Sequence, residues 1–234
     1  MFKWLKEAIV ALGDVFKHPT PPPKPHLIPY DHYHMPFGPN LVKNGSFELG
    51  PFDASVTEMV VQGSGVIMDW QVLQSPAFLA GAGGKARWID SSHPVFHKAA
   101  DGTHFVNLTG GTPPGPVMPA ALYQDAALGL QPGQRYEVAI EVGVGPNNGP
   151  SANFGPPVKV GVRVIRMPDS VEQVFVCNPV NPPTGTGVTW ERFYFRFAIP
   201  ATYVLQPGNE TITIWGQAGN YFIGVDNVSV RSLT

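Results

Sequence analysis

The acidic residues are the first candidates for chemistry, because most glycoside hydrolases work with a pair of carboxyl groups. Glu137 and Glu141 share one face of a segment in which apolar and polar residues alternate. A catalytic pair must lie about 5 to 9.5 Å apart, whereas four residues of extended chain at about 3.3 Å each separate these two by roughly 13 Å. The sequence contains no nucleophile elbow, phosphate-binding loop or His-Glu-x-x-His helix. We therefore expect that the protein is not an enzyme.

Aromatic residues beside hydrogen-bonding side chains suit a different chemistry, the binding of sugars. Sugar C–H faces stack on aromatic rings while the hydroxyl groups pair with polar side chains. Trp215 shares a strand face with Thr211 and Thr213, opposite two isoleucines, so we expect its indole ring to point outward. By the same alternation, Tyr194 and Arg196 share a face turned away from the core. These patterns make Trp215, Tyr194 and Arg196 candidate glycan-binding residues.

The histidine and cysteine residues, which are common metal ligands, give little indication of a metal site. His32 and His34 lie two residues apart beside Asp31, which would place both imidazole rings on one side of an extended chain. No further ligand converges on them in the sequence, so histidines that are solvated or packed on a partner are the favoured interpretation. Cys177 is the single cysteine, which excludes an internal disulfide and a multi-cysteine zinc site. We expect Cys177 to be structural.

The composition indicates an all-β protein with many turns. The 234 residues include 26 glycines and 26 prolines, yet 43% of the chain is hydrophobic. This combination argues against a helical bundle and against a disordered chain. Charged residues make up 14% and the net charge is −2, so the basic surplus expected of a nucleic-acid-binding protein is absent. No apolar run reaches the roughly 18 residues that would cross a bilayer.

Alternation with a period of two recurs from about residue 40 to 232 and predicts half-buried antiparallel strands. The clearest segments are 136–143, 158–165 and 193–198. Further predicted strands are 66–73, 85–90, 104–109, 120–127, 171–177, 209–216 and 221–231. Loops rich in Gly, Pro and Asn separate them. Eight or more strands in one domain indicate a two-sheet sandwich over residues 40–234.

The N-terminal residues 1–17 contain no proline and end before a proline cluster, which predicts one short helix. Its charged residues fall within an arc of roughly 100°, and the remaining circumference is apolar. A helix this apolar needs a burial partner. The side chains expected to contact that partner are Phe2, Trp4, Leu5, Ile9, Leu12 and Phe16.

Four burial partners are open for this helix. A secretory signal would need a longer uninterrupted apolar stretch than residues 8–12 and a cleavage site. A membrane interface favours a broader basic face than this helix offers, so we do not expect membrane binding. The favoured partner is a groove on another protein or a bundle of copies of this chain, which would make a homo-oligomer. Packing onto the chain's own domain is the remaining alternative.

Residues 18–39 form a connector with eight prolines and four of the histidines. Such a segment takes an extended, polyproline-like backbone with few internal hydrogen bonds. We expect a semi-rigid spacer that holds the domain away from the helix.

Several short motifs follow one another in the predicted domain. They are residues 40–48, Trp70, residues 100–108, Tyr123 and Gln124 ahead of residues 130–136, residues 190–193 and residues 224–230. In this order they resemble the galactose-binding-domain-like jelly rolls, a group that includes many carbohydrate-binding modules. The resemblance covers residues 40–232, does not extend to residues 1–39, and implies an antiparallel jelly-roll sandwich.

The resemblance also implies two kinds of site. Jelly rolls of this type often hold a structural calcium ion where the first and last strands meet, and Glu48 and Asp226 occupy the matching positions, with carbonyl groups near 99–103 as further ligands. The alternative is that Asp226 caps a turn and Glu48 is solvated. Trp88 and Gln124 fall where modules of this family often place glycan-binding groups.

Together these features predict a modular protein, in which residues 1–17 anchor a non-catalytic jelly roll to a larger assembly. Glycan-binding modules act outside cells, but the sequence shows no recognisable secretory signal. A phage-like virion reconciles the two, because its proteins are made in the cytoplasm and meet cell-surface glycans after lysis. The alternatives are a purely structural decoration protein without a ligand, and a bacterial surface or polysaccharide-processing protein such as a glycoside hydrolase.

Overall fold

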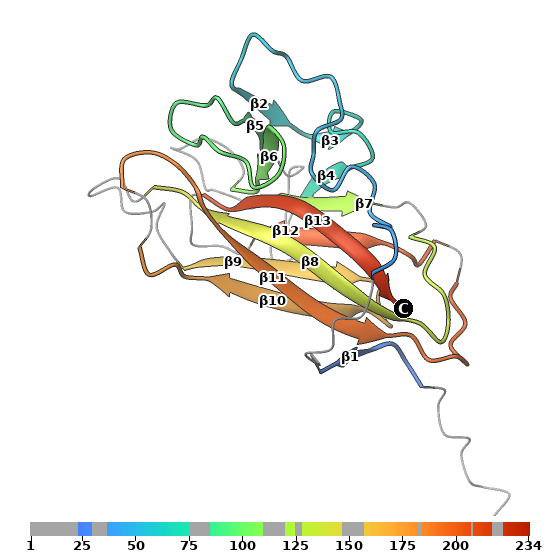
Figure 1. Cartoon of the computed structure of the whole chain (residues 1–234). Coiled ribbons are helices and arrows are strands. Elements are labelled where there is room, and N and C mark those ends of the chain that lie inside the picture. Colours follow the sequence, from blue (N-terminus) through green and yellow to red (C-terminus); the bar gives the residue numbers. More distant parts are fainter. Residues whose placement is uncertain are drawn as a thin grey trace, which may run out of the picture.

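Apolar side chains at every second position assemble the chain into two antiparallel β-sheets (Figure 1). The computed structural model describes residues 23–29, 37–74, 85–109, 120–124, 128–146, 157–181, 184–206, 208–216 and 222–234. The predicted helix over 1–17, with its partner-contacting side chains, lies outside these ranges, as do Asp31, His32 and His34. Within them, nothing helical reaches the length and hydropathy of a bilayer-spanning segment.

The larger sheet has seven strands in the order β1-β11-β8-β13-β6-β5-β2. Their bounds are β1 (His26–Ile28), β11 (Thr189–Ala198), β8 (Arg135–Val144), β13 (Gly224–Leu233), β6 (His104–Asn107), β5 (Ala86–Asp90) and β2 (Glu58–Val61). The smaller sheet has six strands in the order β10-β9-β12-β7-β4-β3. Their bounds are β10 (Val171–Cys177), β9 (Val158–Val164), β12 (Ile212–Gly216), β7 (Ala120–Gln124), β4 (Gln71–Gln74) and β3 (Gly63–Ser64).

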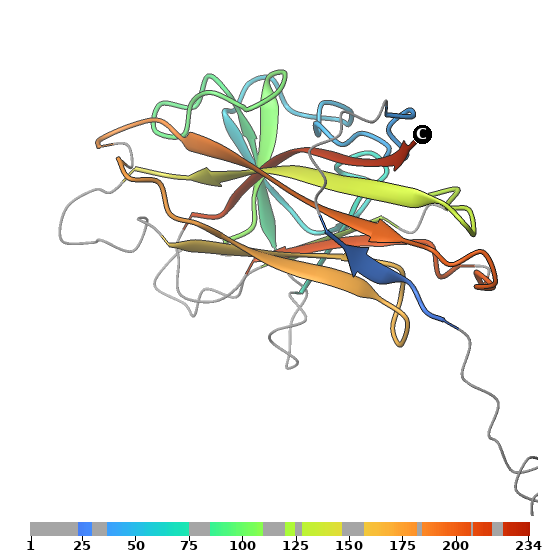
Figure 2. The ribbon, with the colours of Figure 1, turned by 60° about the horizontal axis from the view of Figure 1, so that its bottom comes forward.

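Neighbouring strands in both sheets pair antiparallel, and the sheets stack as two layers (Figure 2). The predicted all-β jelly-roll sandwich is confirmed. Its core lies between the layers, where Val138 and Ile140 of β8 and Val160 and Val162 of β9 are fully buried. Because β-branched side chains suit a pleated, buried surface, the alternation that predicts these strands also fills the core.

The predicted strand positions agree with the structure over most of the sandwich and differ near its beginning. The strand predicted over 66–73 starts later, as β4, because residues 67–70 form a turn with Asp69 at a φ of 67°. The strands β2 and β3 were not predicted. With four and two residues, they are too short for a period of two to be recognised.

The proline-rich connector is partly built into the sandwich. The strand β1 lies along the edge of β11 (Figures 1 and 2), with Leu27 opposite Phe197. Lys24 forms an ion pair with Asp169, and Phe37 forms a β-bridge with Leu233. Residues 23–29 and 37–39 therefore belong to the domain, whereas we expected a spacer as far as residue 39.

The opening motif lies beside the closing strand, where the family resemblance places it. The side chain of Asn40 donates a hydrogen bond to the Val228 carbonyl at 3.1 Å and accepts two, from the backbone N–H of Val42 at 3.1 Å and of Val230 at 3.0 Å. Gly45 approaches so closely that a Cβ atom there would lie 2.1 Å from the Val228 carbonyl oxygen. Asn40 and Gly45 thus hold the opening motif against β13 of the larger sheet.

Replacing Asn40 with alanine tests this attachment of the opening motif to β13. Asn40→Ala leaves two N–H groups and one carbonyl without their partner, and we expect it to lower the free energy of unfolding by about 1–3 kcal/mol. Urea denaturation followed by circular dichroism measures the change. The control Asn178→Ala, at an exposed position, should stay within about 0.5 kcal/mol of the parent protein. Equal effects of the two substitutions would contradict the role of Asn40.

Candidate functional site

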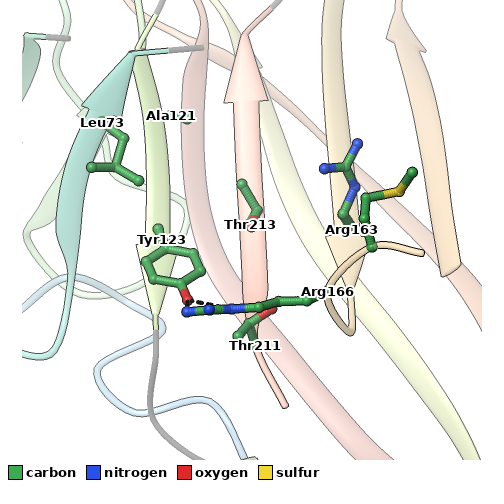
Figure 3. Close-up of a pocket in the computed structure, with 8 residues that line it drawn as sticks. Leu73, Ala121, Tyr123, Arg163, Arg166, Thr211 and Thr213 are labelled. Atoms are coloured by element: carbon green, nitrogen blue, oxygen red, sulfur yellow. Dashed lines mark hydrogen bonds between the residues drawn. The ribbon is translucent and has the colours of Figure 1, made fainter. Parts of the chain in front are cut away.

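The outer face of the smaller sheet carries a groove of about 530 Å³. Its lining side chains come from β4, β7, β12 and β9 and from the residues next to β9 and β12 (Figure 3): Leu73, Ala121, Tyr123, Arg163, Arg166, Met167, Thr211 and Thr213. The residues between them along the strands, including Leu122, Val162 and Ile214, are fully buried in the core. The volume lies in the range typical of small-molecule and cofactor sites.

Strand register places one row of polar side chains across this face. Tyr123 of β7 lies opposite Thr213 of β12, which in turn lies opposite Arg163 of β9. The row continues to Gln71 of β4 at one end and to Glu172 of β10 at the other. Cross-strand neighbours have Cβ atoms about 5 Å apart, so a phenol ring, a hydroxyl group and a guanidinium group stand side by side.

Two arginines are held against aromatic rings in the groove. Arg166 donates to the Tyr123 hydroxyl group from Nε at 3.1 Å and from an Nη atom, and its guanidinium carbon is 5.6 Å from the ring centroid (Figure 3). Arg163 forms an ion pair with Glu172 at 2.8 Å and lies 5.3 Å from the centroid of Trp215. Cation–π attraction and hydrogen bonds thus position both guanidinium groups before any ligand arrives.

The outward direction predicted for Trp215 is confirmed, but its exposure is not. Trp215 lies on the outer face opposite Gly161 and Ala121, yet only 5% of it is exposed. A Cβ atom at Gly161 would lie 2.1 Å from the indole ring, so the ring lies flat over this glycine with Arg163 against it. Trp215 therefore supports Arg163 and offers little ring surface for direct stacking on a sugar.

The prediction that Trp88 and Gln124 contact a glycan is wrong, because both side chains are fully buried. The indole N–H of Trp88 donates to the Phe47 carbonyl at 2.9 Å, and its ring contacts Phe52 at 5.0 Å between centroids. The amide of Gln124 accepts from Lys43 N at 3.0 Å and donates to Lys43 O at 2.9 Å. Both side chains therefore bind the opening segment, Trp88 from β5 and Gln124 from β7, and do not face solvent.

Tyr194 and Arg196 lie on the larger sheet and do not join the groove. Arg196 is 5% exposed and pairs with Glu137 at 3.0 Å, which corrects the expectation that it is accessible. Tyr194 is 44% exposed and lies opposite Ala139. A role of Tyr194 in glycan binding stays a prediction, on a different sheet from the groove.

Glu48 accepts hydrogen bonds at both carboxylate oxygens. Its Oε1 atom accepts from the backbone N–H of Thr103 at 2.9 Å and of His104 at 2.7 Å, and its Oε2 atom is 2.8 Å from the Thr103 hydroxyl and 3.0 Å from His104 Nδ1. Burial raises the pKa of Glu48, but the hydrogen bonds from His104 and Thr103 outweigh burial and leave the pKa below its ordinary value. Glu48 is therefore a bonded residue and not the solvated one of the alternative interpretation.

Asp226 is fully buried and caps the turn at residues 100–101. Its Oδ2 atom accepts from the backbone N–H of Ala100 at 2.8 Å and of Asp101 at 2.9 Å, and its Oδ1 atom from that of Asn227 at 2.7 Å. Burial raises the pKa of Asp226 to about 8, against these hydrogen bonds, which lower it.

The groups around Glu48 and Asp226 do not fit a calcium ion. Calcium needs six to eight oxygen ligands, whereas the carboxylates here face mainly N–H donors. Among the residues that the structure describes, no three His, Cys, Asp or Glu side chains are placed to hold a metal.

The acids considered for catalysis are paired separately. Glu137 pairs with Arg196, and Glu141 lies 3.6 Å from Arg192. The lining residues given above for the groove include no carboxylate. Cys177 is fully buried. Its burial, and to a lesser extent the nearby Glu191, raise the pKa of its thiol to about 12. This environment agrees with the structural role predicted for Cys177.

Sequence reasoning missed Tyr123, Arg163 and Arg166 as site residues. Alternation of Arg163 with the valines of β9 already places it on a polar face. Its place in one row with Tyr123 depends on β12 lying between β7 and β9, which no local pattern reveals.

No family model and no curated protein matches the chain. Solved structures do match. The Stig cyclase Fisc from Fischerella sp. TAU is 15% identical with a TM-score of 0.54, covering 84% of this chain and 98% of that one. The CBM22-1 xylan-binding domain of Paenibacillus barcinonensis Xyn10C is 14% identical with a TM-score of 0.42, covering 84% and 96%. The enzymatically active domain of bacteriophage CBA120 tailspike protein 4 is 15% identical with a TM-score of 0.42, covering 82% and 21%.

These likenesses bear on the fold alone. The cyclase match establishes the architecture, and at 15% identity it transfers no activity. The two matches with a TM-score of 0.42 carry no further weight. The domain thus shares the overall fold of the cyclase.

The hydrogen bonds of Glu48 predict a pH-dependent contribution to stability. A carboxyl group whose folded-state pKa is lowered stabilises the fold above its unfolded-state pKa of about 4.3, and the contribution is lost as the pH falls through the lower folded-state value. We expect Glu48→Gln to lower the free energy of unfolding by about 1–3 kcal/mol at pH 7, and by less below pH 4.

Urea denaturation at a series of pH values measures this effect. The control Glu172→Gln removes an acid that is 47% exposed, and it should change the free energy of unfolding by less than about 1 kcal/mol at pH 7. A Glu48→Gln effect that stays constant from pH 7 to pH 3 would contradict the assigned role.

Proposed function

We propose that this protein is a non-catalytic carbohydrate-binding protein that holds a glycan in the groove over the outer face of the smaller sheet. The observation that carries the proposal is the row of Tyr123, Thr213 and Arg163 across β7, β12 and β9. A phenol ring offers a stacking face for sugar C–H groups, and the hydroxyl and guanidinium groups beside it offer hydrogen bonds to sugar hydroxyls.

The composition of the groove supports this use. Leu73, Ala121 and Met167 give it apolar surface between the polar groups, as sugars with alternating C–H and O–H faces require. Both guanidinium groups are already fixed, so binding a glycan costs little further side-chain ordering.

We further propose that the domain is displayed on a larger assembly, of which a phage-like virion is the favoured example. This rests on the apolar circumference of the predicted helix over residues 1–17. Such a helix gains stability by burial in a groove of a partner or in a bundle of its own copies.

A decoration protein without a ligand is the second candidate. The burial of Trp88 and Trp215 favours it, because the two tryptophans that the sequence offers for stacking are largely withdrawn from solvent. A glycan panel separates the two candidates, since the second predicts that no glycan binds.

Binding to a panel of immobilised glycans, followed by calorimetry on the best ligand, tests the groove. We expect Tyr123→Ala to weaken binding at least tenfold, about 1.4 kcal/mol, because it removes the stacking surface and the acceptor of Arg166. Tyr123→Phe keeps the ring and should bind more tightly than Tyr123→Ala.

The matched control is Tyr194→Ala, which removes a tyrosine from the larger sheet. It should bind like the parent protein, with circular dichroism confirming that every variant is folded. Loss of binding in Tyr194→Ala but not in Tyr123→Ala would move the site to the larger sheet. Failure of the parent protein to bind any glycan would favour the decoration protein.

The anchor is tested in the full-length chain by sedimentation. With no partner present, we expect the apolar helix to drive self-association, and we expect Ile9→Glu combined with Leu12→Glu to give a monomer. Lys6→Ala, on the charged arc of the predicted helix, should leave self-association unchanged. A monomeric parent protein whose residues 1–17 resist proteolysis by packing on the sandwich would contradict the anchoring role.

A further inference from the structure

The side chain of Arg166 crosses one end of the groove. Its backbone follows β9, and its N–H donates to the Asn209 carbonyl at 3.0 Å. The side chain extends past Thr211 to Tyr123 on β7 (Figure 3), where Nε at 3.1 Å and an Nη atom donate to the hydroxyl group. Because β12 lies between β9 and β7, the Arg166–Tyr123 bridge spans the beginning of β12.

The bridge is held at both of its ends. At the β9 end, the Ile165 N–H donates to the Thr211 carbonyl at 3.1 Å, which continues the contact with the β12 side beyond the last residue of β9. In the turn that follows, Asp169 accepts from the Tyr203 hydroxyl group at 3.1 Å and pairs with Lys24. At the β7 end, the guanidinium carbon lies 5.6 Å from the phenol ring centroid. These contacts keep the bridge across the groove.

The exposure of two threonines shows what the bridge covers. Thr211 and Thr213 alternate with the fully buried Ile212 and Ile214, so both threonines face outward. Thr211, beside the bridge, is only 2% exposed, whereas Thr213 is partly exposed. The outer face is therefore covered at the bridge and accessible one position further along β12.

The groove runs along β12 from this bridge. Tyr123 stands on one side of Thr213 and Arg163 on the other, while Leu73 and Ala121 lie at the end away from the bridge (Figure 3). Among the lining residues that the structure describes, none crosses from β9 to β7 at that second end. A ligand that lies along the groove thus meets a barrier at one end only.

We propose that the groove binds the end of a glycan chain, with the terminal sugar unit against the Arg166–Tyr123 bridge and the rest of the chain leaving over Ala121 and Leu73. This proposal rests on the proposed function of the groove and adds the class of its ligand, which is chain ends instead of internal segments. A terminal unit carries a free hydroxyl group where an internal unit continues into the next sugar, and the bridge occupies the space that this continuation would need.

The number of protein molecules bound per glycan chain tests the proposal on the full-length protein. The probes are cello-, xylo- and malto-oligosaccharides of two to six sugar units, each compared with a soluble long-chain fraction of the same sugar. We expect at least one series to bind, and calorimetry should give one protein molecule per chain for its short and long members alike. Borohydride reduction of the last unit then distinguishes the two chain ends, because only binding of the reducing end is lost.

Two variants connect this stoichiometry to the bridge. Arg166→Ala removes the bridge, and Tyr123→Phe removes its acceptor but keeps the ring. Both should admit internal segments and raise the number of protein molecules bound per long chain at least threefold. Arg192→Ala is the matched control, since Arg192 is a half-exposed arginine on the larger sheet, and it should still give one molecule per chain.

The outcomes separate this proposal from the one it rests on. Several molecules of the parent protein on each long chain, with binding that Tyr123→Ala weakens, overturn the recognition of chain ends and leave a carbohydrate-binding groove. An unchanged stoichiometry in Tyr123→Phe overturns the role of the bridge, and this variant decides if Arg166→Ala loses all binding. Absence of binding to all three series overturns the present proposal, and absence of binding to the glycan panel as well overturns both.

Discussion

Burial of alternate residues in β7, β12 and β9 is the constraint on which the groove depends. Leu122, Ile214 and Val162 occupy paired inward positions and are fully buried. Their neighbours along the strands must then face outward. Tyr123 follows Leu122, Arg163 follows Val162 and Thr213 precedes Ile214, so these three outward residues form one row. A slip of one residue in any of these strands would bury a polar group and expose an apolar one, so the core that stabilises the fold also fixes the register of the site.

Small residues decide how the aromatic rings of this face are used. Gly161 leaves room for the indole of Trp215 to lie on the backbone of β9, and Arg163 lies over that ring. Trp215, which alternation correctly predicts to face outward, is thereby covered. It holds the guanidinium group of Arg163 in place instead of contacting a ligand. Tyr123 keeps the more accessible ring, again with an arginine against it.

The first and last segments of the domain are joined by polar contacts. Asn40 bridges the opening motif to β13, while Glu48 and Asp226 bind the N–H groups of residues 100–104. The connector before the domain is attached as well, because Lys24 pairs with Asp169, two residues beyond Met167 of the groove. The attached part of the connector and one end of the groove thus meet at the turn between β9 and β10.

The sequence by itself determined the fold class and most strands, because alternation of valines, isoleucines and phenylalanines with polar residues is a local pattern that directly reports which face is buried. It also placed the outward face of Trp215, and the family resemblance placed residues 40–48 beside the last strand. The tertiary structure decided everything that depends on which strands are neighbours. Tyr123 and Arg163 are 40 positions apart in the sequence and lie in one row only because β12 pairs with both of their strands. Trp88 and Gln124 are buried because the opening segment packs on them, and burial by a distant segment leaves no mark on the local sequence.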